Sequence, residues 1–203
     1  MSAKNAKLRL HTVECDRHNH LEDDCHGITE VHLELREDEK VIGKMLVFRI
    51  EAEKIWDDDS SLVNSCDAHS TAVCQYYEAI SDYKYEGELR RELDQMFPYQ
   101  GNYNALIIDL LEIESEFRRR KLGLFAMRKA MRTWLRNCGL VVIRPLPLQY
   151  RRDTREEEEK SKSTPEFAGD LQKLVRYYKQ LGFKRIGKTE HYALSLEDEL
   201  PRV

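Results

Sequence analysis

Four consecutive cations stand in the stretch EFRRRKLGLFAM, where an apolar run gives way to an amphipathic one. The cations are Arg118, Arg119, Arg120 and Lys121, and Leu122, Gly123 and Leu124 follow them. The first turn of a helix carries unpaired amide protons and the positive end of the helix dipole, so it binds phosphate where the backbone comes close. Gly123 allows that approach, and the cations add charge of the right sign. The stretch therefore predicts a site for a phosphate-bearing ligand.

Positive charge is concentrated around this stretch. Residues 117–136 contain eight cations and no acid, so they carry +8, whereas the whole chain carries −4 and the remainder −12. That remainder would repel an extended polyanion, so we expect no nucleic-acid partner and no membrane partner, and one compact anionic ligand instead. The acidic remainder has two interpretations. It would attract a cationic acceptor, or its charge serves solubility alone.

The elements that position this stretch follow from the spacing of the apolar residues. Residues 30–50 alternate as an antiparallel hairpin, and residues 105–113 and 140–145 are typical of strands buried on both faces. Between these two strands, residues 122–135 carry one apolar stripe with cations opposite, which indicates an amphipathic helix. A strand, a helix and a strand in this order imply a parallel crossover.

The remaining segments complete one domain over residues 1–203. Helical spacing over residues 60–80 is followed by a second helix that stops at Pro98. A further apolar stripe over residues 171–181 ends at Gly182, before a closing hairpin. The charged segment 150–166 is expected to be a mobile loop.

Two ordered motifs make this chain resemble the GNAT N-acetyltransferases. Their pyrophosphate loop has the pattern Gln/Arg-x-x-Gly-x-Gly/Ala; here Arg118 takes the first place, Gly123 the last, and Lys121 stands where the first glycine is expected. RYYKQLGF, residues 176–183, resembles the aromatic-Tyr-x-x-Leu-Gly-Phe segment of the same superfamily. Recognisable similarity covers roughly residues 104–196.

The resemblance implies a fold and a cosubstrate. The fold is α/β of the α+β type, with a mixed, largely antiparallel central sheet flanked by helices and a splayed pair of parallel strands. Acetyl-CoA would lie where the 105–113 and 140–145 strands splay, with its pantetheine paired to backbone near Leu111 and Ile113 as an added strand would be. Its pyrophosphate would sit on the amides of residues 119–124, within reach of the side chains of 118–121.

The implied reaction moves an acetyl group from acetyl-CoA to a primary amine. The expelled thiolate gains from a proton donor, and Tyr178 matches the acid of the superfamily; a core aromatic is its other interpretation. The amine must lose a proton before it attacks, so a carboxylate is the natural base. Asp109 and Glu112 are the candidates, and Glu112 is preferred because it lies nearer the splay. Arg144 would meet an anionic group of the substrate or be structural.

Two other functions stay open. The stretch CDRHNHLEDDCH contains thiol and imidazole groups that could bind zinc, namely Cys15, His18, His20, Cys25 and His26. The spacing of these residues follows no common structural-zinc pattern, so we expect no metal. A metal-binding module is kept as one alternative function. The other alternative is a non-catalytic protein of GNAT fold that binds coenzyme or a partner, because Lys121 could obstruct the approach of phosphate.

The composition predicts where in the cell the protein works. The N-terminus lacks the apolar stretch of a signal peptide, and no run approaches the roughly 20 apolar residues of a membrane helix. Five scattered cysteines are expected to be reduced thiols. We therefore expect a cytoplasmic enzyme; a homodimer is one possible assembly, and the sequence does not decide the oligomeric state. Its acceptor is a small molecule, a polyamine or a protein, and the sequence does not choose between them.

Overall fold

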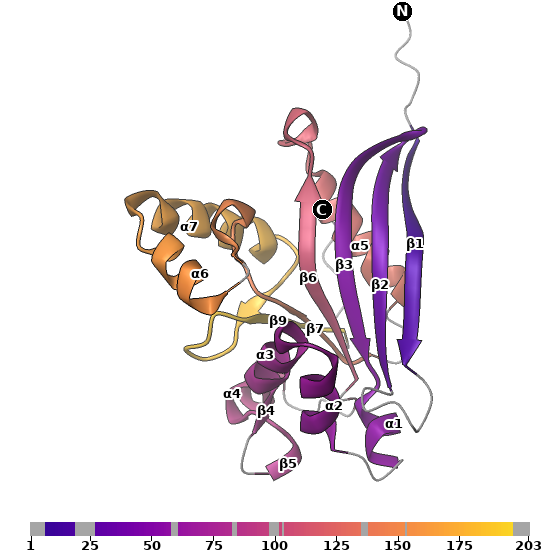
Figure 1. The fold of residues 1–203 in the computed structure, drawn as a ribbon, viewed down its shortest axis with the longest axis vertical. Coiled ribbons are helices and arrows are strands. Elements are labelled where there is room, and N and C mark those ends of the chain that lie inside the picture. The colour runs from indigo at the N-terminus through magenta and orange to yellow at the C-terminus, as the bar shows by residue number, and fades with distance from the viewer. Residues whose placement is uncertain are drawn as a thin grey trace, which may run out of the picture.

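A seven-stranded sheet forms the centre of the protein, in the order β1-β2-β3-β6-β7-β9-β8 (Figure 1). The computed structural model describes residues 7–18, 27–57, 61–82, 85–97, 102, 104–134, 138–152 and 154–196. The strands of this sheet are β1 (Leu8–His18), β2 (Ile28–Glu37), β3 (Lys40–Ile50), β6 (Ala105–Ile113), β7 (Leu140–Ile143), β8 (Lys184–Arg185) and β9 (Tyr192–Ser195). β6 and β7 are parallel, and the other neighbouring strands are antiparallel. The predicted fold class is confirmed.

Helices cover both faces of this sheet (Figure 1). They are α1 (Ala52–Asp57), α2 (Leu62–His69), α3 (Thr71–Ile80), α4 (Arg91–Met96), α5 (Leu122–Trp134), α6 (Arg155–Lys162) and α7 (Pro165–Lys179). α5 packs into one apolar core with one face, whereas α1 to α4 share the other core with the opposite face. Short 3-10 turns at Ser115–Phe117 and Leu148–Tyr150 and a small hairpin, β4 (Ser81–Asp82) with β5 (Tyr85–Leu89), complete the elements.

The first half of β6, Ala105 to Ile108, is buried on both faces, as its apolar run predicts. Ala105 and Ile107 point into the core beneath α1 to α4, and Leu106 and Ile108 into the core beneath α5. The alternation is interrupted at Asp109, because Leu46 of β3 opposes Leu110 while the next residue of β3 opposes Ile108. Asp109 is thus the extra residue of a β-bulge, a feature that redirects a side chain and increases the local twist.

The two parallel strands separate halfway along β6. β7 pairs with β6 only over Ala105 to Ile108, and it ends at Ile143, shortly before Pro145 and Pro147. Proline has no amide proton to donate, so the ladder cannot continue. β6 itself runs on to Ile113, paired with β3 alone. A free edge of β6 is left beside the end of β7.

Two predicted helical segments differ in detail from the structure. The segment 60–80 is divided into α2 and α3 at Ser70, where the backbone is extended. The side-chain hydroxyl of Ser70 caps α3 by accepting a hydrogen bond from the Val73 amide. The helix expected before Pro98 is the short α4, and Leu89 lies in β5 instead. Pro98 itself lies outside the described residues.

The charged segment 150–166 contains a helix, so the predicted mobile loop is corrected. Thr154 caps α6 by accepting from the Glu157 amide at 3.3 Å. Acids occupy the first turn and lysines the last, which matches both ends of the helix dipole. Glu158 is buried against Arg144. The same charges that suggest a solvated loop therefore form ordered pairs here.

Candidate active site

A cavity of about 640 Å³ lies between the free edge of β6, the loop before α5, and α7. It brings together most of the residues predicted to bind coenzyme. Those that line it are Leu111, Ile113, Arg118, Arg119, Lys121, Leu122 and Gly123, and Tyr178 lines it as well. Arg120 and Leu124 do not. The volume is in the range of small-molecule and cofactor sites.

The edge of β6 presents backbone groups to this cavity. The amide of Glu114 donates to Ile42 of β3 at 3.0 Å. The backbone N–H and C=O groups of successive residues in a strand point to alternate sides. Those of Leu111 and Ile113 therefore face away from β3. Arg118 Nε donates to the carbonyl of Ile113 at 2.8 Å, which agrees with that direction. Leu111 is thereby placed to pair with an extended ligand.

The loop before α5 has a backbone suited to an anion. Arg119 has φ of 66° and Lys121 has φ of 57°, and Arg120 between them is not in this left-handed region. Such alternation turns successive amides toward one side and forms an anion-binding concavity. The amides of residues 119–122 have no hydrogen-bond partner within the described part of the chain.

Lys121 occupies its glycine position in a strained conformation. Its positive φ explains why the resembled superfamily has glycine there, since a left-handed residue with a side chain costs about 1 kcal/mol. The side chain is exposed. The lysine therefore keeps the backbone shape that a glycine would give, and it lines the cavity with its side chain exposed.

Arg120 points to a different part of the molecule. Its guanidinium pairs with Glu37 at the end of β2, with Nη1 3.2 Å from Oε2, and lies 5.7 Å from the ring of Phe117. The hydrogen bond from Arg120 holds the pKa of Glu37 below its ordinary value. Although the sequence assigned it to the coenzyme, Arg120 attaches the loop to the β2–β3 hairpin in this structure.

Tyr177 is a cavity residue that sequence reasoning missed. Its hydroxyl accepts from the Leu124 amide at 2.9 Å, in the first turn of α5. A Cβ added to Gly123 would lie 2.8 Å from the same oxygen, so the glycine makes room for the tyrosine. Burial raises the pKa of Tyr177, which keeps the phenol neutral. The signal was present as the aromatic position of RYYKQLGF.

Tyr178 lies in the wall between this cavity and the core. Its ring is partly buried and lies 6.3 Å from that of Phe183 and 5.8 Å from that of Tyr177. Burial raises the pKa of its phenol, so the proton is retained at neutral pH. Tyr178 thus packs like a core aromatic and also lines the cavity, so its predicted role as the acid stays a prediction.

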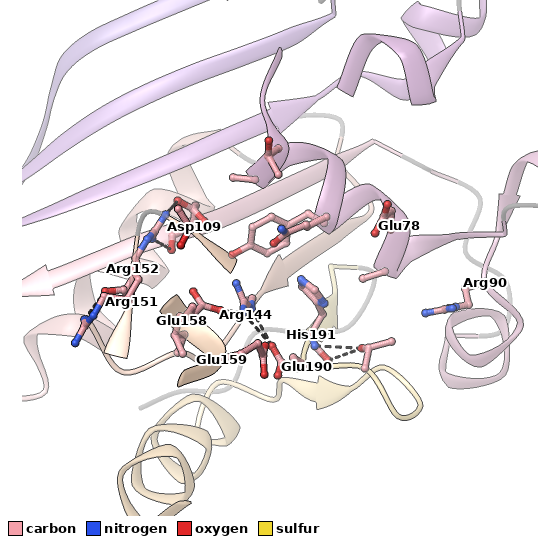
Figure 2. Close-up of a pocket in the computed structure, with 18 residues that line it drawn as sticks. Glu78, Arg90, Asp109, Arg144, Arg151, Arg152, Glu158, Glu159, Glu190 and His191 are labelled. Carbon is pink, nitrogen blue, oxygen red and sulfur yellow. Dashed lines mark hydrogen bonds and ion pairs between the residues drawn. The ribbon is translucent and has the colours of Figure 1, made fainter. Parts of the chain in front are cut away.

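A second cavity of about 600 Å³ adjoins the first (Figure 2). Its walls come from α3, the end of β7, α6 and the turn before β9. Both cavities are lined by Asp109, Arg144 and Leu146. Of the two carboxylates proposed as base, Asp109 has a side chain only 8% exposed, whereas Glu112 is exposed and lines neither of these cavities. The bulge in β6 brings Asp109 to the junction.

Asp109 is paired with a guanidinium. Arg151 Nη2 lies 2.7 Å from its Oδ2, and Nη1 donates to its carbonyl oxygen at 3.2 Å. Figure 2 shows the two side chains meeting at one end of the second cavity. The carboxylate is therefore charge-balanced by a residue of the same cavity.

Arg144 has a structural role in the same wall. It pairs with the buried Glu158 of α6 and, at 3.0 Å, with Glu190 before β9. Lys162 of α6 also contacts Glu190, at 3.0 Å. This network joins β7, α6 and the last hairpin, so α6 is fixed as a wall of the cavity.

His191 and Tyr76 form the inner wall of the second cavity. Their rings meet edge to face, with centroids 5.0 Å apart. Burial first, and then the charge of Arg144, lower the pKa of His191 to about 4, so its imidazole is neutral at pH 7. Its Nε2 has no hydrogen-bond partner among the described residues. Nothing in the local sequence around either residue signalled this contact.

The proposed metal cluster lies largely outside the described residues. His20, Cys25 and His26 are not described, and neither is the side chain of His18. Cys15 is exposed at the end of β1. Where the structure does describe side chains, no group of three or more His, Cys, Asp or Glu could hold a metal. No helix in those same ranges has the length and apolar run needed to cross a membrane.

No protein-family model matches the chain, and no curated protein matches its sequence. Seven chains of solved structures are similar to it, among them the following two. One is Arabidopsis thaliana NAA60 in complex with acetyl-CoA, at 12% identity over 82% of this chain and 76% of that chain, with a TM-score of 0.39. The other is an agmatine N-acetyltransferase mutant in its apo form, at 11% identity over 81% of this chain and 76% of that chain, with a TM-score of 0.41. The mixed, largely antiparallel sheet of this chain and its diverging parallel pair agree with the fold class expected from the sequence.

Proposed function

We propose that this protein is a GNAT-type N-acetyltransferase that moves an acetyl group from acetyl-CoA to a primary amine. The observation that carries the proposal is one cavity in which the free edge of β6 lies beside the unpaired amides of residues 119–122. An extended amide chain ending in a diphosphate is complementary to both features, because a free strand edge pairs with peptide-like groups and a cluster of amides binds anions.

The coenzyme would be held at two places. Its pantetheine amides pair with the backbone of Leu111, and the diphosphate accepts from the loop amides beside Arg119 and Lys121. Arg118, whose Nε donates a hydrogen bond to the carbonyl oxygen of Ile113, closes the end of the strand edge. The thioester then lies toward Asp109, where the two cavities meet.

The second cavity would hold the acceptor amine, and the chemistry is direct transfer. The amine nitrogen attacks the thioester carbon, the new C–N bond forms and the C–S bond breaks. A β6 amide stabilises the oxyanion, because a preorganised donor aimed at developing charge lowers the barrier. Asp109, rather than the exposed Glu112, accepts the amine proton, and Tyr178 protonates the departing thiolate.

Binding and turnover test this proposal separately. We expect acetyl-CoA to raise the melting temperature and to bind with a measurable heat, and we expect free thiol to appear when a suitable amine is added. Tyr178→Phe should lower kcat about 100-fold with little change in acetyl-CoA affinity. A protein that acetyl-CoA neither stabilises nor binds contradicts the proposal. A protein that binds it yet releases no thiol with a broad amine panel supports the non-catalytic alternative.

A further inference from the structure

The ion pair between Asp109 and Arg151 lies where an acceptor amine would have to arrive. Asp109 lines both cavities, and its Oδ2 is 2.7 Å from Arg151 Nη2. While this contact holds, the guanidinium occupies Oδ2, so an incoming ammonium shares the carboxylate with Arg151 or replaces it there. In either case the ammonium lies beside the guanidinium of Arg151.

The neighbouring cations of this cavity are engaged elsewhere. Arg144 is held by Glu158 and Glu190. Arg152 donates to the backbone carbonyls of Gln149 at 2.9 Å and Arg151 at 2.6 Å. Arg151 is 39% exposed and follows the short turn at Leu148–Tyr150, so its side chain has room to turn into the cavity. Arg151 is thus the cation whose partner a ligand would replace.

Charge balance then selects the acceptor. A simple ammonium would bring a second cation to Asp109 beside the exposed guanidinium of Arg151, and two cations at one carboxylate repel each other. An ammonium with an anionic group a few bonds away would pair with Asp109 at one end and with Arg151 at the other. We infer that the acceptor is an amine with a carboxylate or another anion close to the reacting nitrogen, and that Arg151 determines this specificity.

This inference rests on the proposed function and keeps the same balance of atoms. The acceptor inserts as a zwitterion between Asp109 and Arg151, with its anion on the guanidinium. Its ammonium gives one proton to Asp109, and the resulting amine attacks the thioester carbon. As the C–N bond forms and the C–S bond breaks, Tyr178 gives its proton to the departing thiolate and takes the second proton that the nitrogen loses. Arg151 stays paired with the anion of the acceptor throughout.

Matched acceptors test the inference without knowledge of the natural one. Each α-amino acid of a panel is compared with the amine that lacks only its carboxylate, such as phenylalanine with phenethylamine and lysine with cadaverine. Affinity is measured by calorimetry on the protein saturated with CoA, and kcat/KM by thiol release from acetyl-CoA. We expect at least one amino acid to be preferred over its amine about tenfold or more, as a charge-assisted pair would give.

Two arginine variants separate specificity from general charge. Arg151→Gln should abolish the preference because it weakens the binding of the amino acid. Arg152→Gln, which removes a neighbouring charge, should keep the preference for the amino acid. Equal or better binding of the plain amines by the wild-type protein overturns the inference, and so does a preference that survives in Arg151→Gln. If CoA binds and neither class of acceptor does, this inference fails alone. If acetyl-CoA itself does not bind, the proposed function fails and the inference fails with it.

Discussion

At the scale of single residues, Lys121 decides whether the loop before α5 can cradle phosphate. Its φ of 57° shows that the lysine adopts the left-handed conformation that glycine adopts at no steric cost. We predict that Lys121→Gly is more stable than Lys121→Ala by about 1 kcal/mol, because both remove the charge and only glycine relieves the strain. Urea unfolding of the two variants measures the difference. An alanine variant as stable as the glycine variant would show that the loop does not require positive φ.

His191 gives the molecule a dependence on pH. Its pKa in the folded protein is about 4, below the ordinary 6.5, chiefly because burial disfavours the charged imidazolium. The unfolded chain therefore binds the proton first as pH falls, and stability present above pH 6.5 is lost progressively down to pH 4. The loss from this residue amounts to about 3 kcal/mol at most.

Replacement of the imidazole isolates that contribution. His191→Phe keeps a ring against Tyr76 and removes the titrating group, so its free energy of unfolding should fall less steeply between pH 6.5 and pH 4 than that of the wild type. Urea titrations at several pH values measure both slopes. Parallel slopes would mean that other groups account for the pH dependence in this range.

At the scale of elements, the contact between α5 and α7 holds together two sides of the cavity beside the free edge of β6. The Tyr177 hydroxyl accepts from the Leu124 amide, much as a capping side chain does. Tyr177→Phe should therefore lower the free energy of unfolding by about 1 kcal/mol. The control is Tyr192→Phe, which removes a hydroxyl from β9 and should change stability less. Equal effects of the two variants would deny a special role to the α5–α7 contact.

The elements also show what sequence reasoning could reach. β6, α5 and α7 were predicted from apolar periodicity, because burial on one or both faces leaves that pattern in the chain. α6 was missed because a run such as REEEEKSK has no apolar stripe, and its stability comes from the distant partners Arg144 and Glu190.

The geometry of the candidate site was predicted less completely than the fold. Leu111, Gly123 and Tyr178 could be placed from motifs, and they line one cavity. The bulge at Asp109 depends on the register between β3 and β6, and the pairing of Arg120 with Glu37 depends on how the hairpin packs against the loop. Neither is encoded in local spacing, so the position of the base and the direction of Arg120 could not be derived.

At the scale of the whole molecule, charge is divided between a basic segment and an acidic remainder. Residues 117–136 carry +8 within a chain of −4. We predict that the affinity for acetyl-CoA falls about tenfold between about 0.05 M and about 0.5 M salt, because screening weakens the attraction of the coenzyme phosphates to this segment. Acetyl-pantetheine, which lacks the diphosphate, should show little dependence on salt. The same decline for both ligands would place the effect outside the phosphate contacts.

We propose that the gap between β6 and β7 binds acetyl-CoA through backbone amides. Hydrogen–deuterium exchange, resolved to single amides by NMR and recorded with and without saturating acetyl-CoA, measures this contact amide by amide. We predict slower exchange at Leu111 and at residues 119–122, with little change along the distant β1. Unchanged exchange at those amides in the presence of saturating ligand, or protection confined to another part of the molecule, would contradict it.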